Sequence, residues 1–124
     1  MRIGMLTSGG DCQCLNATME AIAKVLYKKD KDIEIYGILD GFTGLINGKY
    51  KKMEKADFDN ILLSGGTILG TSRQPFKTIT KPDENGRDKV EMMVKNYEKS
   101  YFLRFQLGSS LEKNLTEAIR LPIF

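Results

Sequence analysis

The chain has 124 residues, of which 41% are hydrophobic and 28% charged, a balance typical of one folded domain with a small core and not of a disordered segment. Its formal net charge of +3 is too small to indicate nucleic-acid binding, and its lysines are interspersed with acidic residues. No apolar stretch reaches the length of a membrane span and the first residues lack the apolar region of a signal peptide, so the sequence predicts a cytoplasmic protein without a membrane partner.

Residues 3–39 predict a βαβ unit. The apolar run Ile3–Leu6 is bounded by turn residues, as a short buried strand is. Apolar residues at helical spacing predict a helix over Asn16–Lys29, and Ile33–Leu39 has the composition of a second strand. Because a helix connects the two strands, we expect them to be parallel, with a right-handed crossover.

The loop between the first strand and the helix has the sequence Thr7-Ser8-Gly9-Gly10-Asp11. Its glycines can bring backbone N–H groups close to phosphate oxygens, at the amino end of a helix, which favours anions. It lacks both the Lys-Ser/Thr ending of a P-loop and the pattern of a dinucleotide-binding fold. A plain strand-to-helix turn therefore stays an alternative.

The only cysteines are Cys12 and Cys14, and there is no histidine. A four-ligand zinc site cannot be assembled from these residues, and a disulfide across one intervening residue would be strained. We therefore expect free thiols and predict no metal ligand.

The segment Asp40–Leu45 follows the second strand, and its two glycines predict a turn at the carboxyl end of the sheet, where ligands bind in open α/β folds. Phe42 within it is either a platform for a purine base or a core residue. The lysine-rich segments 28–31 and 49–52 are expected to be solvated turns.

A second glycine loop, Gly65–Arg73, follows a short helix predicted over Asp57–Leu63. Its hydroxyl groups, free backbone N–H groups and terminal guanidinium together can hold an anion, because arginine can bind two oxygens at once. The alternative is a flexible surface turn with an exposed arginine.

The remainder of the chain predicts a turn-rich connection at residues 81–86, a helix over 89–98 and a half-exposed strand over 101–107. A capping box at residues 109–112 and a weak helical stripe over 111–119 follow, and Pro122 ends the stripe.

Three of these segments resemble motifs of the 6-phosphofructokinase family. Residues 3–12 with Leu15-Asn16-Ala17 resemble its amino-terminal signature, residues 40–45 its second ligand loop, and residues 65–73 its phosphate-donor loop. The motifs stand in the family's order between residue 3 and about residue 100. The resemblance implies an incomplete three-layer α/β fold, a mainly parallel, Rossmann-like sheet with helices on both faces.

The resemblance also implies roles for four residues. Gly10 would place its backbone N–H against the donor phosphates, and Arg73 would bridge donor and acceptor phosphates and stabilise the charge that develops during transfer. Gln74 would line the same pocket, and Phe42 takes the place of an aromatic residue that stacks on adenine. The implied reaction is glycolytic phosphoryl transfer from ATP or pyrophosphate to fructose 6-phosphate, giving fructose 1,6-bisphosphate with Mg²⁺, in a family whose members are homo-oligomers.

Two differences from the family motifs lie in the first helix region. Gln13 and Cys14 replace a Pro-Gly pair, so that a side chain stands where glycine allows close approach of a ligand. Glu20 stands where bacterial allosteric members carry an effector-binding arginine. Classical regulation by ADP or phosphoenolpyruvate is therefore not expected.

The largest difference lies in residues 101–124. The family's Gly-Gly-Asp-Gly-type loop, with its Mg²⁺-binding acid, corresponds to residues 107–112, where only Gly108 fits. The later Thr-Ile-Asp-Asn-Asp motif with the catalytic base is missing. We expect residues 1–100 to be the amino-terminal part of the donor domain and residues 101–124 to be an atypical tail from a frameshifted or truncated gene, with local divergence as the alternative.

We accordingly expect this chain alone to be inactive as an enzyme. The alternatives to a 6-phosphofructokinase are a non-catalytic nucleotide- or phosphate-binding module and a non-functional truncated fragment.

Overall fold

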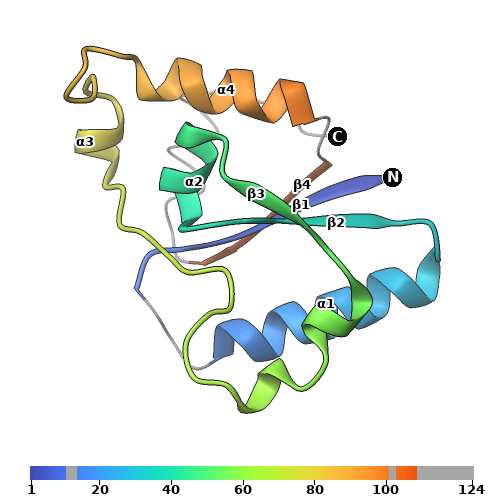
Figure 1. The fold of residues 1–124 in the computed structure, drawn as a ribbon. Coiled ribbons are helices and arrows are strands. Elements are labelled where there is room, and N and C mark those ends of the chain that lie inside the picture. The colour runs from blue at the N-terminus through green and yellow to red at the C-terminus, as the bar shows by residue number, and fades with distance from the viewer. Residues whose placement is uncertain (11–13, 101–102, 109–124) are drawn as a thin grey trace.

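A computed structural model describes residues 1–10, 14–100 and 103–108, in which a four-stranded sheet has the order β3-β2-β1-β4 (Figure 1). β1 (Arg2–Ser8) pairs in parallel with β2 (Glu34–Ile38) on one side and with β4 (Leu103–Gly108) on the other. β3 (Tyr50–Met53) runs antiparallel to β2 at one edge of the sheet. The described helices are α1 (Cys14–Lys29), α2 (Gly41–Asn47), α3 (Phe76–Ile79), α4 (Lys89–Ser100) and the 3₁₀ helices η1 (Lys55–Phe58) and η2 (Ile61–Leu63).

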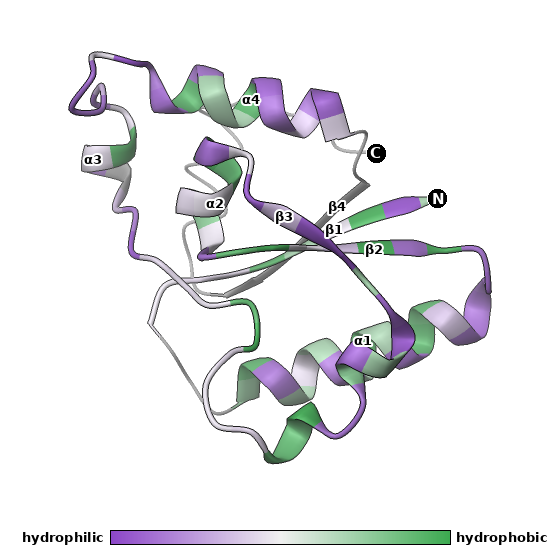
Figure 2. Ribbon diagram, in the orientation of Figure 1, coloured by the Kyte–Doolittle hydropathy of each residue, from purple (hydrophilic) through white to green (hydrophobic). Residues whose placement is uncertain are grey.

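Helices cover both faces of the sheet, with α1 on one side and α2, α3 and α4 on the other (Figure 1). The alternation of side chains along the strands builds the two cores. Ile3 and Met5 of β1 pack with α1, whereas Leu6 packs with α2. Figure 2 shows the hydrophobic stretches of β2 and α1 that contribute to these layers. The two clusters are Ile3, Met5, Met19, Ala23, Ile33, Ile35, Met53, Phe58, Ile61 and Leu69, and Leu6, Ile38, Phe42, Leu45, Ile46, Ile79 and Met93.

The βαβ prediction is confirmed, because β1, α1 and β2 follow one another and the two strands are parallel. The predicted helix over 89–98 is α4, and the strand predicted over 101–107 is β4, residues 103–108. The capping box and helical stripe predicted after residue 108 lie outside the described residues.

The prediction of a solvated turn over residues 49–52 is wrong, because Tyr50–Met53 forms the edge strand β3. Only Met53 of this strand is buried, at 2% exposure, while Lys51 and Lys52 are exposed. Charged side chains are tolerated on an edge strand, where they prevent pairing with other chains. One buried residue in four is too little to reveal a strand by alternation.

The turn predicted over residues 40–45 is also wrong, because α2 begins at Gly41 and continues to Asn47. Asp40 adopts a left-handed conformation with φ 57°, which ends the extended chain abruptly and lets the helix begin directly. The short helix predicted over 57–63 is divided into η1 and η2, since Asn60 between them also has positive φ.

In the part of the chain that the structure describes, no helix combines the length and the apolar character needed to span a bilayer.

Candidate functional site

The two glycine loops meet at the carboxyl edge of the sheet (Figure 1). The Thr71 hydroxyl donates to the carbonyl oxygen of Gly9 over 2.8 Å, and the Gly9 N–H donates to the carbonyl oxygen of Ser72 over 3.4 Å. These bonds join segments more than sixty residues apart in the chain. Parallel strands place the segments after β1 and β2 at one edge of the sheet. The second glycine loop, which follows η2, is held at this edge because the Asp40 N–H, just after β2, donates to the Leu69 carbonyl oxygen over 2.9 Å.

A buried threonine at the end of β1 secures this junction. The Thr7 hydroxyl, fully buried, donates to the carbonyl oxygen of Gly70 over 2.7 Å. Because its only hydrogen is used there, the Thr67 hydroxyl donates to Thr7 Oγ1 over 3.0 Å. Thr7 is therefore a structural residue of the site and not a surface for ligands.

Arg73 lies beside Gly10. A Cβ atom built on Gly10 would lie 3.8 Å from Nη2 of Arg73, and both residues are exposed. Within residues 1–10, 14–100 and 103–108, no carboxylate forms an ion pair with Arg73. An exposed guanidinium that has no ion pair in the described part of the chain therefore lies next to a backbone position without a side chain, as an anion-binding site requires.

Gln74 belongs to the same edge of the sheet. Its side-chain Nε2 donates to the Thr43 hydroxyl over 3.0 Å, and the Thr43 hydroxyl donates to Ser72 Oγ over 2.8 Å. The Ser72 hydroxyl in turn donates to the carbonyl oxygen of Asp40 over 2.6 Å. A continuous polar chain therefore connects the start of α2 to the residues on either side of Arg73.

Phe42 stands between Gly41 and Thr43 of this edge, but it is buried in the core. Its side chain is 4% exposed and packs with Leu45, Ile79 and Met93 among others. Of the two interpretations of Phe42, the core role describes its position here, and the ring presents little surface on which a base could stack.

Helix α1 fixes the segment that leads into the second glycine loop. Asn16, fully buried, donates from Nδ2 to the Ser64 carbonyl oxygen over 2.9 Å and accepts at Oδ1 from the Ile68 N–H over 2.8 Å. Both ends of the loop 64–68 are therefore held by one amide side chain. The helical spacing of Asn16 to Met19 and Ala23 is the signal that could have revealed its burial, but not its partners.

Glu20 supports the same segment one helical turn later. Its Oε2 accepts a hydrogen bond from the Leu62 N–H over 3.0 Å, and its Oε1 forms an ion pair with Lys24. The bond from Lys24, followed by the one from Leu62, lowers the pKa of Glu20 below its ordinary value. Glu20, which stands where the family resemblance places an effector-binding arginine, thus has a structural partner within its own chain.

The Glu20→Gln variant is expected to lower the melting temperature at pH 7 and to have a shrinking effect as the pH falls. The lowered pKa means that the charged form stabilises the fold above the ordinary glutamate pKa of about 4.3, and that this stabilisation is lost as the pH falls through the folded pKa. Thermal unfolding followed by circular dichroism between pH 7 and pH 3 measures the difference. Glu91→Gln, on the exposed side of α4, is the control; a Glu20→Gln difference that stays constant with pH contradicts the prediction.

A family model described as "Phosphofructokinase" matches residues 2–104. The chain is 48% identical over 99 residues to the ATP-dependent 6-phosphofructokinase of Spirochaeta thermophila and 44% identical over 98 residues to that of Bacillus licheniformis. Each alignment covers 77% of this chain, but only 27% and 28% of the respective relative. The chain therefore spans little more than a quarter of the length of these relatives.

Two solved structures share the fold. Pichia pastoris phosphofructokinase in the T-state matches 96% of this chain and 12% of its own, with a TM-score of 0.75 at 25% identity. The pyrophosphate-dependent phosphofructokinase from Nitrosospira multiformis matches 95% of this chain and 29% of its own, with a TM-score of 0.73 at 14% identity. These likenesses confirm the predicted α/β fold.

Proposed function

The chain belongs to the phosphofructokinase family, and we propose that its two glycine loops bind the phosphate groups of a phosphoryl donor. The observation that carries the proposal is the position of the Arg73 guanidinium beside Gly10, with no ion pair to it in the described residues. A phosphate group between them would accept from the backbone N–H groups of the first loop and from the arginine fork at once.

The reaction that we propose for the whole protein is phosphoryl transfer from ATP or pyrophosphate to fructose 6-phosphate. In such a transfer the protein mainly positions the reactants and stabilises charge. Arg73 supplies a fixed positive charge for the transferring group, Gly10 supplies space and a backbone donor, and Gln74 lines the pocket next to Arg73. The two relatives are named ATP-dependent 6-phosphofructokinases, which supports this activity and favours ATP as the donor.

Family members use Mg²⁺, which neutralises phosphate charge when bound. The described residues bring together no group of three or more histidine, cysteine, aspartate or glutamate side chains. We assign no described residue to the metal.

Titrating the 124-residue chain with pyrophosphate and with ATP, by calorimetry, tests the proposed binding. We expect saturable binding that weakens as the salt concentration rises, because the contacts are charged and exposed. A chain that is folded by circular dichroism and binds neither ligand would contradict the proposal and favour a non-functional fragment. Formation of fructose 1,6-bisphosphate by the chain would distinguish an enzyme from a non-catalytic phosphate-binding module, for which binding alone is expected.

The Gly10→Ala variant is expected to bind pyrophosphate about tenfold more weakly, a loss of about 1.4 kcal/mol, with an unchanged melting temperature. The added Cβ would make an ordinary contact, 3.8 Å from Arg73 Nη2, and Gly10 does not have the positive φ that strains other residues. The methyl group would nevertheless occupy the space between the backbone and the guanidinium. Calorimetric titration and thermal unfolding measure the two effects.

The control for the effect of an added methyl group on stability is Gly65→Ala, where a Cβ would meet no atom within 4 Å. Wild-type affinity in Gly10→Ala would show that no phosphate lies between Gly10 and Arg73.

A further inference from the structure

The Thr43 hydroxyl is the centre of the polar chain around Arg73. Ser72 uses its only hydroxyl hydrogen on the Asp40 carbonyl oxygen, so its oxygen must accept from Thr43. Thr43 also donates to Ser72 Oγ from its backbone N–H over 3.3 Å. Since Thr43 has given its hydroxyl hydrogen to Ser72, its oxygen is free to accept from Gln74 Nε2.

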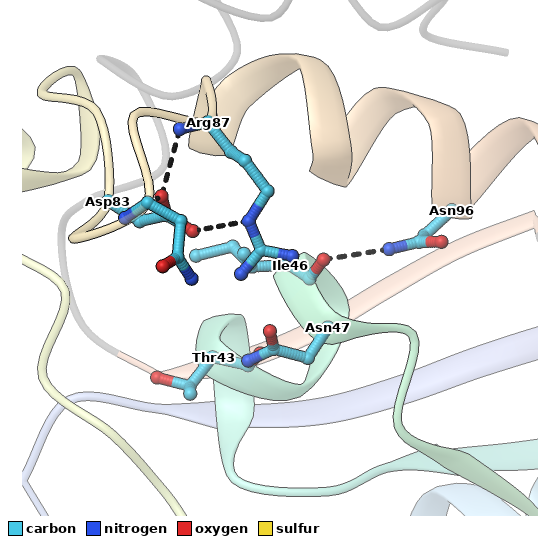
Figure 3. Close-up of polar contacts among 7 residues, drawn as sticks. Thr43, Ile46, Asn47, Asp83, Arg87 and Asn96 are labelled. Atoms are coloured by element: carbon cyan, nitrogen blue, oxygen red, sulfur yellow. Dashed lines mark hydrogen bonds and ion pairs between the residues drawn. The ribbon is translucent and has the colours of Figure 1, made fainter.

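Helix α2, which carries the Thr43 hydroxyl, is itself held in place by hydrogen bonds. Asn47 donates from Nδ2 to the Thr43 carbonyl oxygen over 2.9 Å within the helix. Asn96 of α4 donates to the carbonyl oxygens of Leu45 and Ile46, each over 2.9 Å. Figure 3 shows Thr43 and Asn47 on α2, with the Asn96 side chain reaching the end of the helix at Ile46. Contacts to α4 and to the core therefore fix α2, and with it the position of Thr43.

We propose that Thr43 is a positioning residue for phosphate binding, which holds the residues on both sides of Arg73 so that the guanidinium is directed toward Gly10. The inference rests on the proposed function, because it concerns the same site. Thr43 binds Ser72 before the arginine and Gln74 after it, and so restrains the backbone from which the side chain extends. Ordering this segment before the ligand arrives removes an entropic cost that binding would otherwise have to overcome.

The test compares Thr43→Val with Thr43→Ser in the full 124-residue chain, with pyrophosphate as the titrant. Valine keeps the branched shape and removes the hydroxyl, whereas serine keeps the hydroxyl. We expect about fivefold to tenfold weaker binding in Thr43→Val, where tenfold corresponds to about 1.4 kcal/mol, and wild-type affinity in Thr43→Ser. Thermal unfolding of each variant shows whether the chain is folded at the temperature of titration.

A double-mutant cycle with Arg73→Ala separates positioning from a general structural role. If Thr43 acts through Arg73, Thr43→Val causes no further loss of affinity in the Arg73→Ala background. An equal loss in both backgrounds, or wild-type affinity in Thr43→Val, overturns the proposal while leaving the proposed function intact. A folded wild-type chain that binds no pyrophosphate overturns both.

If Thr43→Val does not fold, Ser72→Ala removes the other end of the same hydrogen bond. Its affinity for pyrophosphate should fall by a similar factor, and wild-type affinity there contradicts the positioning role.

Discussion

Replacing Arg73 with alanine is expected to weaken pyrophosphate and ATP binding by about thirtyfold to a hundredfold. A hydrogen bond to a charged group is worth about 1.5–3 kcal/mol, and a hundredfold loss corresponds to about 2.7 kcal/mol. One guanidinium can donate two parallel bonds to a phosphate, so its removal costs more than that of any other described side chain at this edge of the sheet. Calorimetric titration at low and at high salt measures the loss.

Two control variants make the Arg73 result specific. Lys51→Ala removes the same charge from the exposed edge strand β3, on the antiparallel side of the sheet, and should leave the affinity nearly unchanged. Arg73→Lys keeps the charge without the planar fork and should bind with intermediate affinity. An equal loss in Lys51→Ala would mean that net charge alone attracts the ligand, and the proposed site would then be wrong.

The exposure of Arg73 allows binding to be separated from stability. Its side chain is exposed and has no ion pair in the described residues, so Arg73→Ala should melt at the wild-type temperature. Weaker binding in a chain of unchanged stability can then be attributed to the lost contact.

The layers of the fold could be predicted from the sequence because their signals are local. Ile3–Leu6 is an uninterrupted apolar run, and the apolar residues of α1 recur at helical spacing, so both elements show within a few residues. β3 carries one buried residue among exposed lysines, and α2 contains two glycines in seven residues. Such short elements form because the sheet edge and α4 bind them, which local patterns do not reveal.

Of the candidate site, the sequence could predict the glycines and Arg73 from residue types, and Gln74 from the family resemblance. The two loops could be predicted as candidate anion-binding segments, but the proximity of Gly10 to Arg73 depends on how the chain folds between them. The role of Thr43 arises from a serine 29 residues away and that of Asn16 from carbonyl and N–H groups 48 and 52 residues away. A hydroxyl or an amide gives no sign in the sequence of which distant partner it will bind.

The position of Phe42 could not be decided from the sequence either. The family resemblance places an adenine platform there, and hydrophobic character alone also predicts a core residue. Phe42 is buried in the cluster with Leu6 and Met93, in the helix that begins directly after Asp40. The backbone conformation at Asp40 could not be predicted from residue types.

Gly44→Ala is expected to be the most destabilising of the proposed substitutions, because it forces a side chain into a backbone contact. A Cβ atom on Gly44 would lie 1.6 Å from the carbonyl oxygen and 2.7 Å from the carbonyl carbon of Leu39, and 3.2 Å from the carbonyl oxygen of Lys49. Gly44 also accepts from the Lys49 N–H over 2.7 Å, and Lys49 accepts from the Leu39 N–H over 2.9 Å. These three residues form a tight backbone junction between β2 and α2, in which no side chain can move aside.

The cost of this substitution is expected to be about 3 kcal/mol or more, because overpacking that shifts backbone exceeds the usual penalty for an enlarged core residue. For a domain of this size, that corresponds to a melting temperature lowered by roughly 10–20 °C. Shifting α2 also moves Thr43, so pyrophosphate binding should fall even at temperatures where the variant is folded. Thermal unfolding and titration at a temperature well below the transition measure both effects.

Gly65→Ala is the matched control for Gly44→Ala, since it adds the same methyl group where no atom lies within 4 Å and where φ is not positive. Its melting temperature should remain close to that of the wild type, because surface substitutions usually change stability by less than about 0.5 kcal/mol. Equal melting temperatures for the two variants would show that α2 can move away from Leu39 at little cost. Helix α2 would then not hold Thr43 in a fixed position. The direction of the Arg73 side chain would have to be set by the second glycine loop alone.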